Sequence, residues 1–292
     1  MAAHFQSAIV LFGDSLTQAW STGSLAHLMS EVYMRKMDVL NRGFGGYTTE
    51  WCLPIFNKIF ARKDAQAGLP PVKLVTIWFG ANDATLPPCT QALSLDKYVA
   101  NLNHYISSLV EPASDYYQPE ARIVVITPPP IVHSMRLEQP LPPHVPKGEQ
   151  GKERNLEYTR KFKDACLEVG RAWDVKTGGK IKVLDTWTTI VDAAGGEKDD
   201  LLRPLYSDGL HFTAQGYRAI FDGLMKVIIS SWEDLNPVTM KQTIPRYVAG
   251  TKEWAWHTTP PLLAGKAWAE IDPENPTAAL KDKAAAHLKD EL

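Results

Sequence analysis

Three side chains in two short motifs have the types needed for nucleophilic catalysis. Ser15 lies in a Gly-Asp-Ser-Leu run at 13–16, and Asp208 and His211 lie in an Asp-Gly-Leu-His run at 208–211. A serine hydroxyl is a poor nucleophile at neutral pH, so it needs a base such as histidine, whose tautomer a carboxylate can fix. Asp208 and His211 are close enough in sequence to face the same cleft. The plainer alternatives are that Ser15 caps a helix and that His211 is an ordinary surface or core histidine.

Two further motifs offer hydrogen-bond donors for the negative oxygen of a tetrahedral intermediate. Asn82, in a Gly-Ala-Asn-Asp run at 80–83, carries an amide N–H, and the glycine-rich run at 43–46 lets the Gly46 N–H approach a ligand closely. Together with the backbone N–H of Ser15, these groups would form an oxyanion hole. The alternatives are an ordinary Asn-Asp turn and a plain turn between a strand and a helix.

The motifs follow apolar segments that are expected to be strands. Five such segments, separated by helical patterns, predict an α/β fold: a flavodoxin-like, doubly wound sheet of five parallel strands with helices on both faces. Ligands in such sheets bind beyond the carboxyl ends of the strands, so three of the motifs should converge at one edge. The expected strands are 8–13, 38–41, 72–79, 122–127 and 181–184.

Helices are indicated where apolar residues recur every three to four positions. Thr49 is expected to cap the second of them. The expected helices are 24–35, 49–62, 95–110, 155–173 and 213–232.

Two stretches lie outside this alternation. Residues 128–151 hold seven prolines together with His133 and His144, which predicts a long loop at the site edge, acting as a lid or a substrate wall. Residues 233–292 are rich in proline and tryptophan and are expected to wrap the core and end in a frayed helix from about residue 276. The chain is therefore predicted to have one catalytic domain, 1–232, and a C-terminal extension, 233–292, that is not an independent domain.

Tryptophans in the extension raise the question of self-association. They could form the interface of a homodimer, or they could pack on their own core. These residues are Trp254, Trp256 and Trp268.

Composition excludes several classes of protein. The formal net charge of −2 gives no basic surplus for nucleic acid, and 45% hydrophobic residues suit a globular chain. Cys52, Cys89 and Cys166 are far apart and odd in number, which favours reduced buried thiols over a zinc site or disulfides, and no metal-ligand cluster is evident.

The ends of the chain bear on its location. No secretion signal or membrane span is evident at the N-terminus, so a cytoplasmic location is expected. The terminal Lys-Asp-Glu-Leu run at 289–292 is an ER-retention address, which leaves the ER as a lesser alternative.

Taken in their order along the chain, the four motifs that contain Ser15, Gly46, Asn82 and His211 resemble those of the SGNH, or GDSL, hydrolases. The resemblance covers about residues 8–232. The resemblance implies that Ser15 is the nucleophile, His211 the base and Asp208 its orienting carboxylate, and that Ser15, Gly46 and Asn82 donate to the oxyanion. It implies no cofactor. The runs at 41–44, 78–84 and 206–211 are most similar to those of the isoamyl acetate-hydrolysing esterases. The extension at 233–292 departs from that pattern.

The expected activity is hydrolysis of small carboxylic esters, such as isoamyl acetate, through an acyl-serine intermediate. The absence of a Gly-x-Ser-x-Gly run around Ser15 argues against an α/β-hydrolase. A lysophospholipase, a thioesterase or a sugar O-deacetylase on the same fold stays an open alternative. A non-catalytic binding module is the remaining one.

Overall fold

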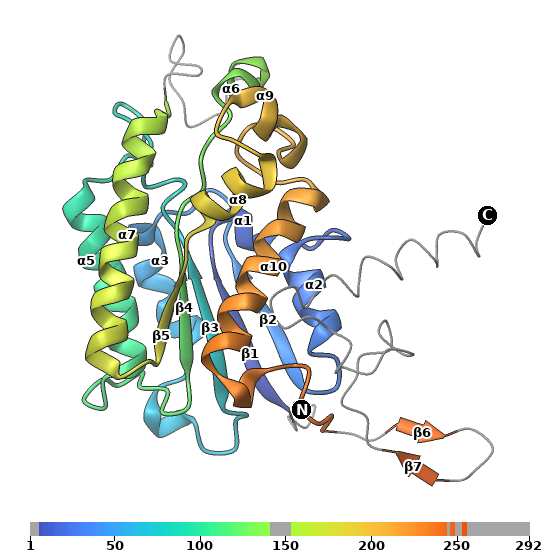
Figure 1. The fold of residues 1–292 in the computed structure, drawn as a ribbon. Coiled ribbons are helices and arrows are strands. Elements are labelled where there is room, and N and C mark those ends of the chain that lie inside the picture. The colour runs from blue at the N-terminus through green and yellow to red at the C-terminus, as the bar shows by residue number, and fades with distance from the viewer. Residues whose placement is uncertain (1–5, 141–152, 244–245, 249–252, 256–292) are drawn as a thin grey trace.

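The computed structural model describes residues 6–140, 153–243, 246–248 and 253–255. Its centre is a five-stranded parallel sheet in the order β2-β1-β3-β4-β5 (Figure 1). This arrangement confirms the predicted flavodoxin-like, doubly wound sheet, in which the strand order reverses between β1 and β3. The strands are β1 (Ser7–Gly13), β2 (Met37–Gly43), β3 (Val72–Trp78), β4 (Arg122–Ile126) and β5 (Ile181–Leu184).

Helices cover both faces of the sheet (Figure 1). From β1 the sheet extends to β2 on one side and to β3, β4 and β5 on the other. Because the crossovers are right-handed, the helix between β1 and β2 lies on one face of the sheet, and the helices between β3 and β4 and between β4 and β5 lie on the opposite face. One face therefore carries α2 (Leu25–Val32) and α10 (Ala214–Ser231), and the other carries α5 (Leu95–Val110) and α7 (Leu156–Thr177).

The alternation of side chains along the strands feeds one apolar cluster on each face. In β1, Ile9 and Leu11 belong to the cluster beneath α2 and α10, whereas Val10 and Phe12 belong to the cluster beneath α5 and α7. All four are buried. The central strand is thus apolar on both sides, as a strand covered by two helical layers must be.

The predicted helix at 49–62 is interrupted. The segment forms α3 (Thr49–Cys52), the 3-10 turn η1 (Leu53–Ile55) and α4 (Phe56–Ile59). Pro54 lies at the start of η1 and has no N–H to continue an α-helical ladder. The cap is also one residue earlier than predicted, because the Thr48 side chain accepts from Trp51 N while Thr49 is already helical.

The proline-rich stretch at 128–151 is less irregular than predicted. It contains α6 (His133–Glu138), a helix of six residues that begins at His133. The part from 141 onward, including His144, lies outside the described residues. Two helices that were not predicted follow β5, namely α8 (Thr186–Ala194) and α9 (Asp199–Leu202), and the short turn η3 (Arg203–Leu205) leads on towards α10.

The start of the extension lies against the end of the sheet opposite the site. After the 3-10 turn η4 (Glu233–Leu235), the Leu235 carbonyl accepts from Tyr33 Oη at 2.7 Å and Thr243 N donates to the Arg35 carbonyl at 2.6 Å. Further on, β6 (Arg246–Val248) and β7 (Glu253–Ala255) form an antiparallel pair that was not predicted. Trp256, Trp268 and the helix expected from about residue 276 lie outside the described residues, as does the side chain of Trp254.

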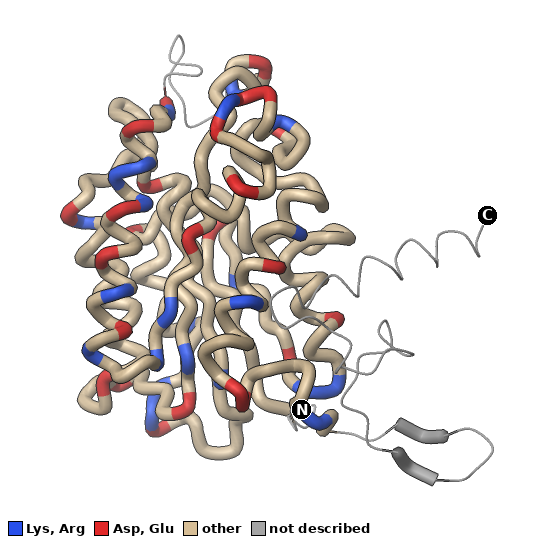
Figure 2. Tube along the Cα trace, in the orientation of Figure 1, with Lys and Arg blue, Asp and Glu red and all other residues tan. Residues whose placement is uncertain are grey.

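Charged residues are distributed over the helices rather than gathered in one region. Figure 2 shows basic and acidic positions interspersed along the chain in this view. Within the described ranges, no helix is both long enough and apolar enough to cross a bilayer. Cys52, Cys89 and Cys166 are all buried thiols, as expected.

Helix α7 approaches β5 at a glycine, and this contact yields a prediction. A Cβ on Gly170 would lie 2.3 Å from Val183 Cγ2. We expect Gly170→Ala to destabilise the fold by about 1–3 kcal/mol, because the overpacking outweighs the gain of about 1 kcal/mol in helix propensity. Urea unfolding measures the change in the free energy of unfolding.

The matched control removes the neighbour. In a Val183→Ala background the added methyl group meets no side chain at that distance, so Gly170→Ala should become neutral or stabilising. An equal loss of stability in both backgrounds would contradict the close packing of α7 on β5.

Candidate active site

Ser15 lies at the first position of α1 (Ser15–Gln18), immediately beyond the carboxyl end of β1. Asp14, not Ser15, caps this short helix, because Asp14 Oδ1 accepts from Leu16 N at 2.9 Å. The capping interpretation of Ser15 is therefore wrong, and its hydroxyl is available for another partner. Two contacts hold α1 in place: Tyr217 Oη donates to the Leu16 carbonyl at 2.9 Å, and Asn41 Nδ2 donates to the Thr17 carbonyl at 2.9 Å.

His211 and Asp208 come from the loop that precedes α10 and reach Ser15 across the edge of the sheet. His211 Nε2 lies 2.8 Å from Ser15 Oγ, and His211 Nδ1 lies 2.7 Å from Asp208 Oδ2. The other carboxylate oxygen, Asp208 Oδ1, accepts from the backbone N of Leu210 at 2.9 Å and of His211 at 2.8 Å. The three residues predicted from the two motifs thus form one continuous hydrogen-bonded chain.

Asp208 is held in its ionised form. Partial burial raises the pKa of its carboxyl, but hydrogen bonds and charge from His211 outweigh burial, so the pKa lies well below its usual range. Arg136, on α6, adds a positive charge, with Nη1 3.6 Å from Asp208 Oδ2. The Arg136 side chain is buried and also faces Glu153, whose Oε1 lies 3.4 Å from Nη2.

Gly46 lies in the turn between β2 and α3, with a φ of +79° that favours glycine. Its carbonyl accepts from Gln91 Nε2 at 2.6 Å, which fixes the orientation of the following peptide. The buried Gln91 was not predicted as a site residue, because a single glutamine in a loop forms no motif with the glycine-rich run.

Asn82 lies in the turn after β3, and its amide is bonded at both ends. Nδ2 donates to the Tyr47 carbonyl at 2.9 Å, and Oδ1 accepts from Arg154 Nη2 at 3.1 Å. The next residue, Asp83, is buried and joins the turns after β2 and β3, since Oδ1 accepts from Thr49 N at 2.9 Å.

The two aspartates beneath the site are shielded from solvent. Burial raises the pKa of Asp14 to about 7, against the lowering effect of the hydrogen bond from Leu16. Burial likewise raises the pKa of Asp83 to about 6, against hydrogen bonds from Thr49. Burial thus makes the charged form of both carboxyls less favourable than in an exposed aspartate.

All five predicted site residues line one cleft of about 330 Å³, namely Ser15, Gly46, Asn82, Asp208 and His211. Arg136, Gln139 and Pro140 also line the cleft, and they belong to the stretch 128–151 that was predicted to form a lid or substrate wall, although none of them was singled out. Gln91, Arg154 and Leu210 were not predicted to line the site. Leu210 was within reach of the sequence argument, because it lies inside the Asp-Gly-Leu-His motif. No motif singled out Arg136 within the stretch 128–151, and Arg154 lies between that stretch and the predicted helix at 155–173, where no motif marks it.

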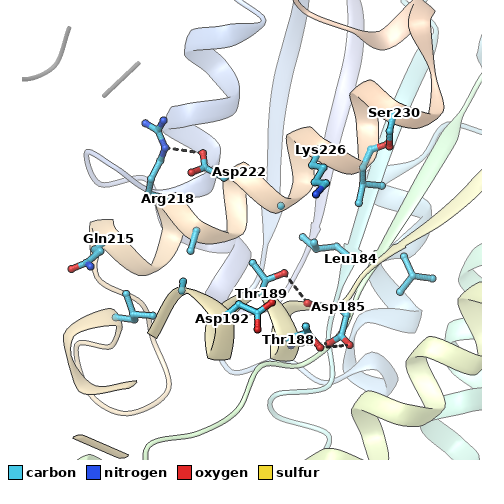
Figure 3. Close-up of a pocket in the computed structure, with 16 residues that line it drawn as sticks. Leu184, Asp185, Thr188, Thr189, Asp192, Gln215, Arg218, Asp222, Lys226 and Ser230 are labelled. Carbon is cyan, nitrogen blue, oxygen red and sulfur yellow. Dashed lines mark hydrogen bonds and ion pairs between the residues drawn. The ribbon is translucent and has the colours of Figure 1, made fainter. Parts of the chain in front are cut away.

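A larger groove, of about 920 Å³, lies between α8 and α10 (Figure 3). Its wall mixes acidic and basic side chains, with Arg218 Nε 2.8 Å from Asp222 Oδ1 and Asp185 bonded to Thr188 (Figure 3). None of the predicted site residues lines it. It offers no serine–histidine pair, so the smaller cleft is the candidate active site.

Comparisons with known proteins identify the family to which the chain belongs. Residues 11–219 match the model of the GDSL-like lipase/acylhydrolase family. A GDSL esterase/lipase of Arabidopsis thaliana is 31% identical over 243 residues, which are 82% of this chain and 91% of that protein. The isoamyl acetate-hydrolyzing esterase 1 homologue of Rattus norvegicus is 36% identical over 73% of this chain and 78% of its own length. The homologue of Homo sapiens is 34% identical over 75% and 80%.

Solved structures show the same fold at low sequence identity. An acetylxylan esterase from Geobacillus stearothermophilus superposes with a TM-score of 0.52 at 16% identity, covering 78% of this chain and 96% of that one. With the family model spanning most of the chain and relatives above 30% identity, this chain belongs to the GDSL-like lipase/acylhydrolase family and is a carboxylic ester hydrolase.

Proposed function

We propose that this hydrolase is a serine esterase that cleaves small carboxylic esters, in particular acetate esters such as isoamyl acetate, through an acyl-Ser15 intermediate. The observation that carries the proposal is the hydrogen-bonded chain from Ser15 Oγ through His211 to Asp208, with separations of 2.8 and 2.7 Å. The names of the rat and human relatives support the choice of substrate. The cleft of about 330 Å³ suits a small ester.

Acylation begins with transfer of the Ser15 hydroxyl proton to His211 Nε2. Ser15 Oγ then attacks the ester carbonyl carbon, and the backbone N–H groups of Ser15 and Gly46 and the Asn82 amide donate to the resulting oxyanion. When the tetrahedral intermediate collapses, the bond to the alcohol oxygen breaks and His211 Nε2 returns the proton to the leaving alcohol. Asp208, ionised throughout, stabilises the imidazolium in between.

Deacylation repeats the same steps with water. His211 removes a proton from a water molecule, the hydroxide attacks the acyl carbon, and the bond to Ser15 Oγ breaks as His211 returns the proton to it. The released product is the carboxylic acid. Every proton in this cycle passes through His211, so the proposed chemistry requires no cofactor.

The nucleophile gives the first prediction for activity. Ser15→Ala should abolish hydrolysis of p-nitrophenyl acetate, because no other hydroxyl is bonded to His211 Nε2 among the contacts of the described residues. Circular dichroism should show an unchanged fold. Ser107→Ala, which removes an exposed hydroxyl on α5, is the matched control and should leave the rate unchanged. Retained hydrolysis by Ser15→Ala would end the proposal.

The orienting carboxylate gives the second prediction. Asp208→Asn should lower kcat by about 10⁴-fold, because the amide no longer stabilises the imidazolium and favours the wrong histidine tautomer. Steady-state kinetics with the same ester measure the effect. Asp192→Asn, on the groove between α8 and α10, should have no effect. If kcat of the Asp208→Asn variant stayed within about tenfold of the parent value, Asp208 would have no place in the mechanism.

The substrate class is tested separately with a panel. Isoamyl acetate and other short acetate esters should be turned over with higher kcat/KM than a lysophospholipid, an acyl-CoA thioester or an acetylated sugar. Each measurement is paired with Ser15→Ala to subtract background hydrolysis. A higher kcat/KM for any of the three rival substrates would replace the acetate ester in the proposal while leaving Ser15 in its role.

A further inference from the structure

Arg154 is a buried cation beside the cleft. It lies just before α7, pairs with Thr85 in an isolated antiparallel bridge, and is only 5% exposed. Burial lowers the pKa of its guanidinium to about 10, so the side chain is still charged at neutral pH. A buried charge costs several kcal/mol in desolvation unless its surroundings compensate, so its partners are informative.

The partners of Arg154 belong to the turn that carries Asn82. One guanidinium nitrogen donates to the Ala81 carbonyl, and Nη2 donates to Asn82 Oδ1 at 3.1 Å. At the other end of the amide, Nδ2 donates to the Tyr47 carbonyl at 2.9 Å. A flipped amide would set its N–H groups against the guanidinium donors and its oxygen against the Tyr47 carbonyl, losing both hydrogen bonds.

We propose that Arg154 is a positioning residue for the oxyanion hole, which locks the Asn82 amide so that the second N–H of Nδ2 is presented to the cleft. Only one N–H of Nδ2 is used by Tyr47, and Asn82 lines the cleft together with Ser15. A charged donor on Oδ1 also polarises the amide, which strengthens Nδ2 as a donor. This inference rests on the proposed acyl-transfer function.

Arg136, the other buried arginine of the cleft, has a different position. It faces Asp208 and Glu153, and thus the carboxylate end of the triad rather than the oxyanion donors. The two guanidiniums therefore lie near different parts of the machinery. Of these two arginines, only Arg154 donates a hydrogen bond to Asn82 within the described part of the chain.

The first test replaces Arg154 and separates kcat from KM. Arg154→Met should lower kcat for p-nitrophenyl acetate by about ten- to a hundredfold with KM within about twofold, because the lost interaction strengthens only in the transition state. Arg154→Lys keeps the charge but offers a point donor instead of a planar fork, so it should restore part of kcat. If Arg154→Met does not fold, the test rests on Arg154→Lys alone. A kcat of Arg154→Lys equal to that of the parent would then overturn the inference.

The control removes a guanidinium from α7, the helix that begins two residues after Arg154. Arg160, in α7, lies over the Trp187 ring at 4.4 Å and is paired with Glu197, away from the cleft. Arg160→Met should leave kcat within about twofold of the parent. A loss equal to that of Arg154→Met would mean that any disturbance of α7 lowers the rate, and would overturn a specific role for Arg154.

A double-mutant cycle tests whether Arg154 acts through Asn82. Asn82→Ala alone should lower kcat by about 10²–10³-fold. In that background, Arg154→Met should cause less than about threefold further loss, because the amide it positions is gone. Losses that multiply in the double variant would show that Arg154 acts independently of Asn82 and would overturn the inference.

A binding measurement provides a readout that a merely structural role would not change. Methylboronic acid forms a tetrahedral, anionic adduct with an activated serine, whose oxygen occupies the oxyanion hole. Its inhibition constant should rise in Arg154→Met by the same factor by which kcat falls, while the thermal midpoint of Arg154→Lys stays near that of the parent. An unchanged inhibition constant contradicts the inference.

The two proposals can fail separately. If Ser15→Ala retains activity, the proposed function fails. If Ser15→Ala is inactive but the Arg154 variants keep full kcat, only this inference fails.

Discussion

One row of paired residues across the sheet sets the geometry of the site. Gly43, Gly13 and Trp78 are opposite one another in β2, β1 and β3, and the row continues through Ile126 and Leu184. All five strands therefore end at one level, and the turns that follow them leave the sheet side by side. The turn after β1 is closely packed against β3, because a Cβ on Gly13 would lie 2.4 Å from the Trp78 carbonyl oxygen. Ser15 emerges from this turn two residues later.

The polar contacts of the site fix these turns to one another rather than to solvent. Asp83 joins the turn after β3 to Thr49, Gln91 holds Gly46, and Asn82 is bonded to the Tyr47 carbonyl. Each bond links segments at least 34 residues apart in the chain, and most of the groups are buried. Buried hydrogen bonds of this kind are costly to leave unmade, so they hold the turns that carry the proposed oxyanion donors in place before any substrate arrives.

Motifs made the residues of the proposed triad predictable, whereas no motif singled out the residues that support them. Ser15 and His211 are 196 positions apart in the chain. Ser15 is recognisable because it follows an apolar strand, and His211 because a carboxylate, Asp208, lies three residues before it. Arg136 lies within the proline-rich stretch and Arg154 just after it, where no periodicity predicts which way a side chain points. The break at Pro54 was predictable from its missing N–H, but the helical spacing around it outweighed that signal in the prediction. The choice between Thr48 and Thr49 as cap depended on backbone angles that two adjacent threonines do not reveal.

The central claim is that Ser15 is the activated nucleophile of this hydrolase, and covalent mapping tests it most directly. The full-length protein is treated with a fluorophosphonate until esterase activity is lost, and is then digested for mass spectrometry. The account predicts one adduct per chain, on Ser15, with activity falling in proportion to its formation. Loss of activity with the adduct on another residue, or full activity with Ser15 modified, would contradict it.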